Sequence, residues 1–240
     1  MIYCIADTHG DITRFKDKRL KKLKKGDCLI ICGDFGFIWD GSEKEKRILK
    51  KLGKKKYYTL FVEGAHENFE LLQEYPVTEW NGGEVRVISQ RLMYLCRGSV
   101  FNIGETSLFA FGGGLLSEDE QAESLDLFKD AALPSAEDIR RAINNLENAN
   151  RQVDYIVSYE PPSVLEDFFH NADNDILIKS HLNTLFDEIV RCVEFKKWIF
   201  GKCHKNKTVS PKYTAVYTAP IALGDVEETR KGRKRKVAAI

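Results

Sequence analysis

The sequence lacks any apolar run long enough to cross a lipid bilayer, so we expect no contact with a membrane interior. It also lacks a linker rich in proline, glycine or serine that would separate two folded units, so residues 1–224 are expected to form one domain. No signal peptide is recognisable before the first apolar run. Together these absences predict a cytoplasmic protein with one folded domain.

Cysteine pairs of the form Cys-x-x-Cys are absent, although the chain has six cysteines. Most of these cysteines lie inside short apolar runs, which is typical of reduced residues in a hydrophobic core. We therefore do not expect a paired-cysteine metal site or a disulfide framework.

Neither sign of charge dominates, because the net charge of the whole chain is only +1. Six basic residues lie between Arg230 and Lys236, which leaves residues 1–229 with a net charge of −5. This mildly acidic body argues against a broad nucleic-acid-binding face. Residues 225–240 are expected to be a disordered basic tail, for which nucleic acid or another polyanion is a candidate partner.

Polar residues follow each of the first three predicted strands at the point where the strand ends. The strands and the polar residues after them are residues 2–6 with Asp7 and His9, residues 28–32 with Asp34, and residues 58–62 with His66. Helical patterns over residues 11–23 and 42–52 separate the strands, which indicates parallel strand–helix–strand units. Since the carboxyl ends of parallel strands meet at one edge of a sheet, we expect these polar side chains to converge.

The later part of the chain changes from this rhythm to short apolar runs separated by glycines, which we interpret as antiparallel strands of a second sheet. Ser42 and Ser135 are predicted helix N-caps, with Glu45 and Asp138 in the capping-box position. Residues 117–133 are acidic and weakly patterned and are interpreted as a loop or lid. The remaining predicted elements are strands over 92–95, 100–103, 107–111, 153–157 and 197–200, helices over 135–150 and 180–193, and a hairpin-like pair of strands within 213–223.

Five residues at predicted strand ends carry oxygen or imidazole groups of the kind that bind Zn, Mn or Fe. They are Asp7, His9, Asp34, His66 and His204. A single histidine near a turn has little meaning, but such residues at successive strand ends predict a metal centre. The predicted helix over residues 11–23 also has a basic face, which is interpreted as solvated, with contact to phosphate or nucleic acid as the less favoured alternative. Its residues are Arg14, Lys18, Lys21, Lys22 and Lys25.

The order of the short motifs resembles that of the calcineurin-like metallophosphoesterases over residues 1–223. The motifs are Asp-x-His, Gly-Asp, Gly-x-His-Glu, a strand that ends before Pro-Pro, and Gly-x-x-His. The resemblance implies an α/β fold, a four-layer αββα sandwich of two mixed β-sheets flanked by helices. It also implies hydrolysis of a phosphomonoester or phosphodiester, in which two metals share a bridging aspartate and activate a water for attack on phosphorus.

The same resemblance implies a role for each matching residue. Asp7, His9 and His204 correspond to ligands of the first metal, and Asp34 corresponds to the bridging aspartate. His66 corresponds to the histidine that acts on the leaving oxygen. The first metal site is therefore expected to be complete.

Three positions that would serve only the second metal depart from the family pattern. Ala65 replaces an asparagine, Tyr159 replaces the histidine before Pro-Pro, and Lys202 replaces the first histidine of Gly-His-x-His. Lys202 is interpreted either as a positive charge near the second cation's position or as a solvated side chain. Tyr159 is interpreted as a phenolate ligand, a donor to phosphate, or a packed aromatic residue, of which we favour the last.

The sequence thus predicts one divalent metal (Mn, Fe or Zn), a doubtful second metal, and a phosphate-ester substrate or ligand. The first hypothesis is a phosphoesterase whose activity is weak or specialised. The alternatives are an inactive pseudophosphatase that serves as a binding or scaffold protein, and a variant of an active enzyme in which ligands were replaced.

Overall fold

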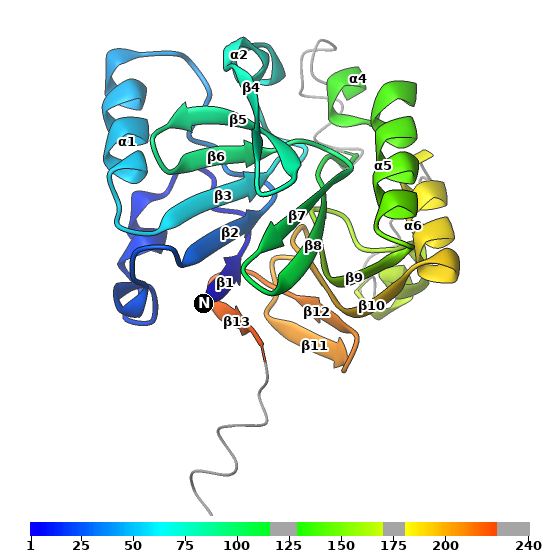
Figure 1. The fold of residues 1–240 in the computed structure, drawn as a ribbon. Coiled ribbons are helices and arrows are strands. Elements are labelled where there is room, and N and C mark those ends of the chain that lie inside the picture. Colours follow the sequence, from blue (N-terminus) through cyan, green and yellow to red (C-terminus); the bar gives the residue numbers. More distant parts are fainter. Residues whose placement is uncertain (116–128, 170–180, 225–240) are drawn as a thin grey trace, which may run out of the picture.

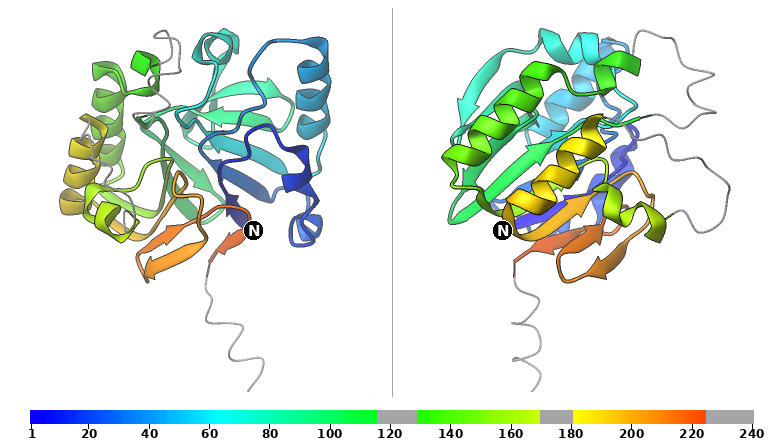
Figure 2. Two further views of the ribbon diagram at one scale, coloured as in Figure 1. Left: turned by 180° about the vertical axis from the view of Figure 1, so that it is seen from behind. Right: turned by 90° about the vertical axis from the view of Figure 1, so that its right-hand side faces the viewer.

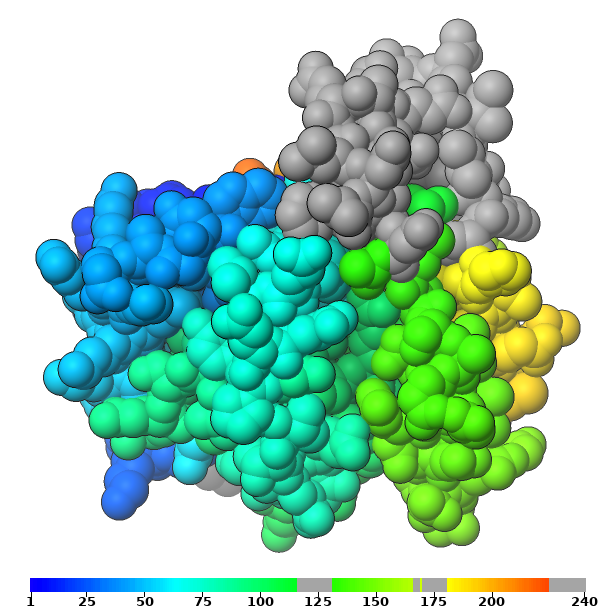
Figure 3. All heavy atoms as spheres, turned by 90° about the horizontal axis from the view of Figure 1, so that it is seen from above, coloured from blue at the N-terminus to red at the C-terminus, as the bar shows by residue number. Residues whose placement is uncertain are grey.

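Two β-sheets pack against each other and carry helices on their outer faces in the computed structural model, which describes residues 1–115, 129–169 and 181–224 (Figure 1). Each sheet contains both parallel and antiparallel strand pairs. The predicted four-layer sandwich of two mixed sheets is therefore confirmed. From above, the amino-terminal residues lie on one side, and residues 136–148 and 181–192 lie on the other (Figure 3).

The first sheet has seven strands in the order β13-β1-β2-β3-β6-β5-β4. They are β1 (Ile2–Ile5), β2 (Cys28–Cys32), β3 (Tyr58–Val62), β4 (Val77–Trp80), β5 (Gly83–Ser89), β6 (Leu92–Leu95) and β13 (Ile221–Leu223). The helical segments of this half are the 3-10 helices η1 (Ile12–Lys16) and η2 (Leu20–Lys22), and the helices α1 (Glu43–Gly53) and α2 (Phe69–Glu74). Strands β1, β2 and β3 are parallel neighbours, as predicted.

The second sheet has six strands in the order β11-β12-β10-β9-β8-β7. They are β7 (Ser99–Ile103), β8 (Thr106–Phe111), β9 (Gln152–Ser158), β10 (Glu194–Phe200), β11 (Lys207–Ser210) and β12 (Tyr213–Ala215). The helices α5 (Ala136–Asn148) and α6 (His181–Cys192) lie side by side on its outer face (Figure 2). Two shorter elements are α4 (Lys129–Ala132) and η4 (Ser163–Phe168).

The hydrophobic side chains form three layers, one between the sheets and one beneath the helices of each sheet. The middle layer brings Cys4, Ile30 and Leu60 of the first sheet against Leu108, Val157 and Ile199 of the second. Every residue of β2 is buried, because its two faces pack on different layers. This explains why the strand reads as an uninterrupted apolar run rather than an alternating one.

The helix predicted over residues 11–23 is wrong, because the segment forms η1 and η2 instead. The carboxylate of Asp11 accepts a hydrogen bond from the backbone N–H of Thr13 at 2.8 Å, and that of Asp17 accepts one from Arg19 at 2.7 Å. Such bonds to the residue two positions on compete with the helical pattern. The aspartates therefore divide the segment into short turns.

Two strand assignments from the sequence are also wrong. Residues 92–95 form β6 of the first sheet, where Leu92 is paired with Thr59 in parallel register, rather than a strand of the second sheet. Residues 213–223 do not form a hairpin, because β12 pairs with β10 and β13 pairs with β1. Strand β11 was not predicted, since its sequence is polar and largely exposed.

The helix caps are partly as predicted. Ser42 and Ser135 both accept the expected backbone hydrogen bond, and Asp138 completes the capping box of α5. Glu45 does not complete the box of α1, because its carboxylate accepts hydrogen bonds from the backbone of Trp39 and Asp40. Of the loop or lid predicted over residues 117–133, residues 129–132 form α4 and residues 117–128 lie outside the described residues, as does the tail 225–240.

A buried ion pair joins the end of β3 to the connection between the two sheets. The Arg97 guanidinium contacts the Glu63 carboxylate, and both side chains are at least nine-tenths buried. Arg97 also donates to the backbone carbonyls of Ala131, Ala132 and Leu133. One side chain thus holds the first sheet to the segment that leads into α5.

We predict that Arg97→Met lowers the free energy of unfolding by about 3–5 kcal/mol, because it leaves the Glu63 carboxylate buried without its partner. Urea denaturation followed by circular dichroism measures the loss. The matched control is Arg140→Met, which removes an exposed ion pair with Glu137 on α5 and should cost less than about 0.5 kcal/mol. Equal losses for the two variants would contradict the role given to the buried pair.

Candidate metal centre

Four strand ends converge at the edge where the two sheets meet. Asp7 and His9 follow β1, Asp34 follows β2, and His66 follows β3, so three of the turns come from neighbouring parallel strands. His204 follows β10 of the second sheet. All five side chains singled out in the sequence are therefore brought to one place.

The ligand atoms of these five residues lie within a few ångströms of one another. Asp7, His9 and His204 form one group whose ligand atoms all lie within 4.8 Å, and His9, Asp34 and His66 form a second such group. The Nε2 atoms of His9 and His204 are 3.4 Å apart, and His9 Nε2 is 3.8 Å from Asp34 Oδ2. The two groups share His9, which makes it the centre of the cluster.

The backbone is strained at most of these positions. Asp7, His9, Asp34 and His204 all have φ between 44° and 50°, and Lys202 has φ of 61°. Residues other than glycine rarely adopt this left-handed region, and such strain is concentrated at functional sites. Gly64 permits the same close packing, since a Cβ there would lie 1.9 Å from Asp34 Oδ1.

Asp7 and Asp34 differ in ionisation although both are buried. Burial, together with the charge of Asp34, raises the pKa of Asp7 to about 8. Burial also raises the pKa of Asp34, but hydrogen bonds from His66 outweigh it and the net shift is downward. His66 donates from its backbone N–H to Asp34 Oδ1 at 3.0 Å, and its Nδ1 lies 2.9 Å from Oδ2. Asp34 therefore ionises at a lower pH than Asp7.

Two residues to which the sequence interpretation gave no role in the site hold the turns in place. Arg14, which was interpreted as a solvated residue, donates to the carbonyls of Ala6, Asp7 and Tyr217. Its guanidinium also lies 4.9 Å from the centre of the Tyr217 ring, which in turn stacks on the His204 imidazole at 5.0 Å. Arg14 thus connects the Asp7 turn with the His204 turn through segments far apart in the sequence.

Glu67 holds the turn that follows Asp34 in place through backbone hydrogen bonds. Its carboxylate is 2% exposed and accepts hydrogen bonds from the backbone N–H groups of Phe35 and Gly36. Burial and the nearby Asp34 raise the pKa of Glu67. The only signal for this role in the sequence was the position of Glu67 directly after His66.

The donor set fits a divalent cation. Asp7 Oδ2 is buried and has no hydrogen-bond partner among the described residues, so an acceptor is left open in the interior of the cluster. Burial lowers the pKa of His9, which favours the neutral imidazole that coordinates metals. Carboxylate oxygens combined with imidazole nitrogens suit Zn, Mn or Fe.

The three positions that depart from the family pattern also lie together. The Tyr159 ring packs on Ala65, and both residues are less than 5% exposed. A Cβ at Gly33 would lie 2.0 Å from the same ring, so Gly33 leaves the space that the phenol fills. The Tyr159 hydroxyl donates to Asp34 Oδ2 at 3.1 Å. Burial, with the charges of Asp34 and Asp7, raises the pKa of Tyr159, which favours the neutral phenol over the phenolate.

The Lys202 side chain is not free in solvent, as one of the two interpretations had it. Its ammonium forms an ion pair with Glu160, whose side chain is 6% exposed, and donates to the Leu115 carbonyl at 3.1 Å. The other interpretation, a positive charge near the second cation's position, stays a prediction. Cys203, between Lys202 and His204, packs into the hydrophobic layer beneath α5 and α6.

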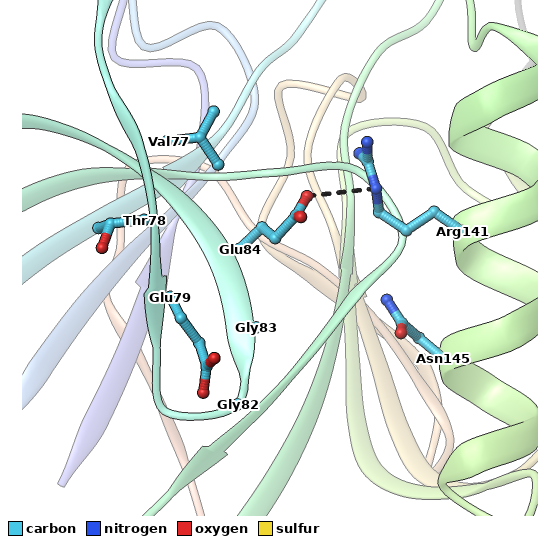
Figure 4. Close-up of a pocket in the computed structure, with 8 residues that line it drawn as sticks. All are labelled: Val77, Thr78, Glu79, Gly82, Gly83, Glu84, Arg141 and Asn145. Carbon is cyan, nitrogen blue, oxygen red and sulfur yellow. Dashed lines mark ion pairs between the residues drawn. The ribbon is translucent and has the colours of Figure 1, made fainter.

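A separate groove of about 370 Å³ lies between the β4–β5 hairpin and α5 (Figure 4). Arg141 of α5 reaches across it to form an ion pair with Glu84 at 3.3 Å. None of the candidate metal ligands lines this groove. The groove is therefore separate from the candidate metal centre.

Comparison with known proteins agrees with the geometry of the site. The sequence model described as calcineurin-like phosphoesterase matches residues 1–185. No curated protein matched the chain. Among the described residues, no helix has both the length and the apolar character needed to cross a membrane.

We predict that cation binding at pH 7 releases about one proton per chain, because a cation needs the Asp7 carboxylate ionised and its pKa is about 8. At pH 9 the carboxylate is already ionised and the release should be near zero. Isothermal titration with Mn²⁺ in two buffers of different ionisation enthalpy measures the protons released. Below pH 8 the affinity should fall roughly tenfold per pH unit, and an affinity that does not vary with pH would contradict the shifted pKa.

Proposed function

Because the chain belongs to the calcineurin-like phosphoesterase family, we propose that it hydrolyses a phosphate ester with a single divalent cation. The family is one of metal-dependent phosphoesterases, and the cluster at the strand ends supplies the donors. The residues that would hold the cation are Asp7, His9, Asp34 and His204. When bound, a divalent cation supplies the Lewis acidity that polarises phosphate and lowers the pKa of water.

His66 is the proposed general acid. Its Nδ1 lies 2.9 Å from Asp34 Oδ2, which orients the ring and supports the protonated imidazole. A proton on Nε2 could then pass to the leaving oxygen. This pairing of an imidazole with a buried carboxylate is the arrangement by which a histidine is usually held for proton transfer.

The observation that carries the single-cation proposal is the Tyr159 hydroxyl on Asp34 Oδ2. In a two-metal site this aspartate bridges both cations, whereas here a neutral O–H group engages one of its oxygens. Ala65 has no donor atom, and the Lys202 ammonium is paired with Glu160. We infer that an aromatic ring and an internal ion pair take the place of the second cation.

These contacts bear on how the replacement arose. The Tyr159 ring needs the small Ala65 and Gly33 beside it, and Lys202 needs the Glu160 carboxylate. Such mutual accommodation supports a natural replacement over ligands removed one by one from an active enzyme. It also supports weak or specialised activity, since loss of one preorganised charge typically costs ~10²–10³ in rate.

A second candidate function is an inactive phosphatase fold that binds its ligand without cleaving it. The hydrogen bond from the Tyr159 hydroxyl to Asp34 favours this second candidate, because a phenol held there would also fill space beside the reacting phosphate. The two candidates differ in one measurable respect, which is turnover by the unmodified chain.

We predict one cation per chain after reconstitution with Mn²⁺, Fe²⁺ or Zn²⁺, measured by elemental analysis, together with slow turnover of bis(p-nitrophenyl) phosphate or p-nitrophenyl phosphate. His66→Ala should retain the cation and lower the turnover rate by about 10²–10⁴. His181→Ala is the matched control, since His181 is an exposed histidine at the start of α6. A cation without turnover would favour the inactive candidate, and two cations would refute the proposal.

We further predict that the combined variant Ala65→Asn, Tyr159→His and Lys202→His binds a second cation and gains at least about 10² in turnover. Tyr159→Phe is the control, because it removes only the hydroxyl and adds no ligand. It should still bind one cation, with no gain comparable to that of the combined variant. No second cation in a folded combined variant would argue against these three positions as the replaced ligands.

A further inference from the structure

Charge is distributed very unevenly along the folded part of the chain. Residues 1–56 contain 16 basic and 8 acidic residues, whereas residues 57–229 contain 15 basic and 28 acidic residues. The acidic average of the body therefore conceals a strongly basic amino-terminal quarter. Such asymmetry points to an anionic partner for that part of the molecule.

The fold brings the basic residues of two separate segments together at one edge. Lys24 and Lys25 precede β2, and Lys54 and Lys56 precede β3, which is its parallel neighbour. The two turns are in direct contact, because the Tyr58 backbone N–H donates to the Asp27 carbonyl at 2.9 Å. Eight exposed lysines make up this surface, which we call the basic edge: Lys21, Lys22, Lys24, Lys25, Lys50, Lys51, Lys54 and Lys56.

The charges of the basic edge are not neutralised within the described part of the chain, where none of the eight lysines forms an ion pair. Two acids of the neighbouring segments already have cationic partners. The Asp27 carboxylate pairs with the ammonium of Met1 at 2.7 Å, and Asp17 pairs with Arg19 at 2.9 Å. Repulsion among eight neighbouring positive charges without ion-pair partners raises the free energy of the folded chain, and a bound anion lowers it.

The described part of the chain ends close to the basic edge. Strand β13 runs antiparallel to β1 and pairs Leu223 with Ile2, so residue 224 lies near the amino terminus (Figure 1). The sequence that follows contains six basic residues between Arg230 and Lys236, which lie outside the described residues.

We propose that the basic edge binds the phosphate backbone of a nucleic acid without regard to sequence. Lysine ammonium groups are point charges that suit phosphates, and contacts to phosphates carry no sequence information. The large apolar side chain exposed at this edge is Met1, whereas stable membrane association needs a broader apolar face. A nucleic acid therefore fits the edge better than a lipid surface.

The basic edge is not part of the candidate metal centre. The metal ligands follow the carboxyl ends of β1, β2 and β3, and the basic edge precedes their amino ends. A strand of five residues spans about 17 Å, so the two sites lie at opposite ends of these strands. Nucleic acid bound there would localise the protein rather than enter the metal centre, and the proposal stands apart from the proposed hydrolysis.

The test is fluorescence anisotropy with a labelled 30-base-pair DNA of arbitrary sequence and a single-stranded RNA of the same length, from 25 to 300 mM NaCl. We expect the full chain to bind both, with affinity that falls steeply as salt rises. The edge variant combines Lys24→Gln, Lys25→Gln, Lys54→Gln and Lys56→Gln. For the DNA, its slope of log K against log salt should be shallower by about 3–4, since each phosphate contact contributes about 0.9. The affinity at 100 mM NaCl should fall at least tenfold.

The matched control removes the same charge from another surface: Arg140→Gln, Arg151→Gln, Arg191→Gln and Lys212→Gln, all at exposed positions. It should lower the slope by much less. Substitution of the same four edge lysines by arginine should retain binding, which separates loss of charge from loss of folding. A third variant, with the six basic residues of 230–236 changed to glutamine, measures what the tail adds.

Several outcomes would overturn the proposal. They are equal losses in the edge variant and its control, binding that depends on the tail alone, or no binding of either nucleic acid by the full chain. Binding only to phosphatidylserine vesicles, lost in the edge variant, would assign the edge to a membrane surface instead.

Discussion

The burial of two carboxylates at the meeting point of the sheets is the constraint on which the rest of the site depends. Asp7 and Asp34 are each no more than 1% exposed, and each raises the energetic cost of ionising its neighbour. Left-handed backbone at both positions, and at the histidines around them, costs further free energy. A structure that carries these costs together is organised for ligand binding rather than for stability.

Supporting contacts from distant segments keep this arrangement in one conformation. The Arg14 guanidinium ties the Asp7 turn to Tyr217, and the Glu67 carboxylate caps the turn after Asp34. On the opposite flank, the Tyr159 ring and the Lys202–Glu160 ion pair fill space with groups that already have partners. The two sides of the site therefore differ. On one side, Asp7 Oδ2 is a buried acceptor without a partner among the described residues. On the other side, the Tyr159 ring fills the space and the Lys202 charge is paired with Glu160.

Much of this architecture could be predicted from the sequence, because short-range rules governed it. The alternation of apolar runs with amphipathic segments gave β1, β2, β3, α1 and α5, and the strand-end residues gave the members of the cluster. The failures came from long-range pairing. Nothing within residues 213–223 indicates that β12 and β13 join different sheets. The bonds of Arg14 to Tyr217 and of Lys202 to Glu160 likewise depend on where distant segments meet.

The pairing of β13 with β1 has a consequence for the order in which the protein can be built. Strand β1, which leads into Asp7, is made long before β13, the strand that pairs with its outer edge among the described residues. The Tyr217 carbonyl, which accepts from Ala6 and Arg14, is also made late. The nascent chain therefore carries an open strand edge until β13 is made, and sheets in that state can pair with other chains. The metal centre can close only after the segment around Tyr217 has been made.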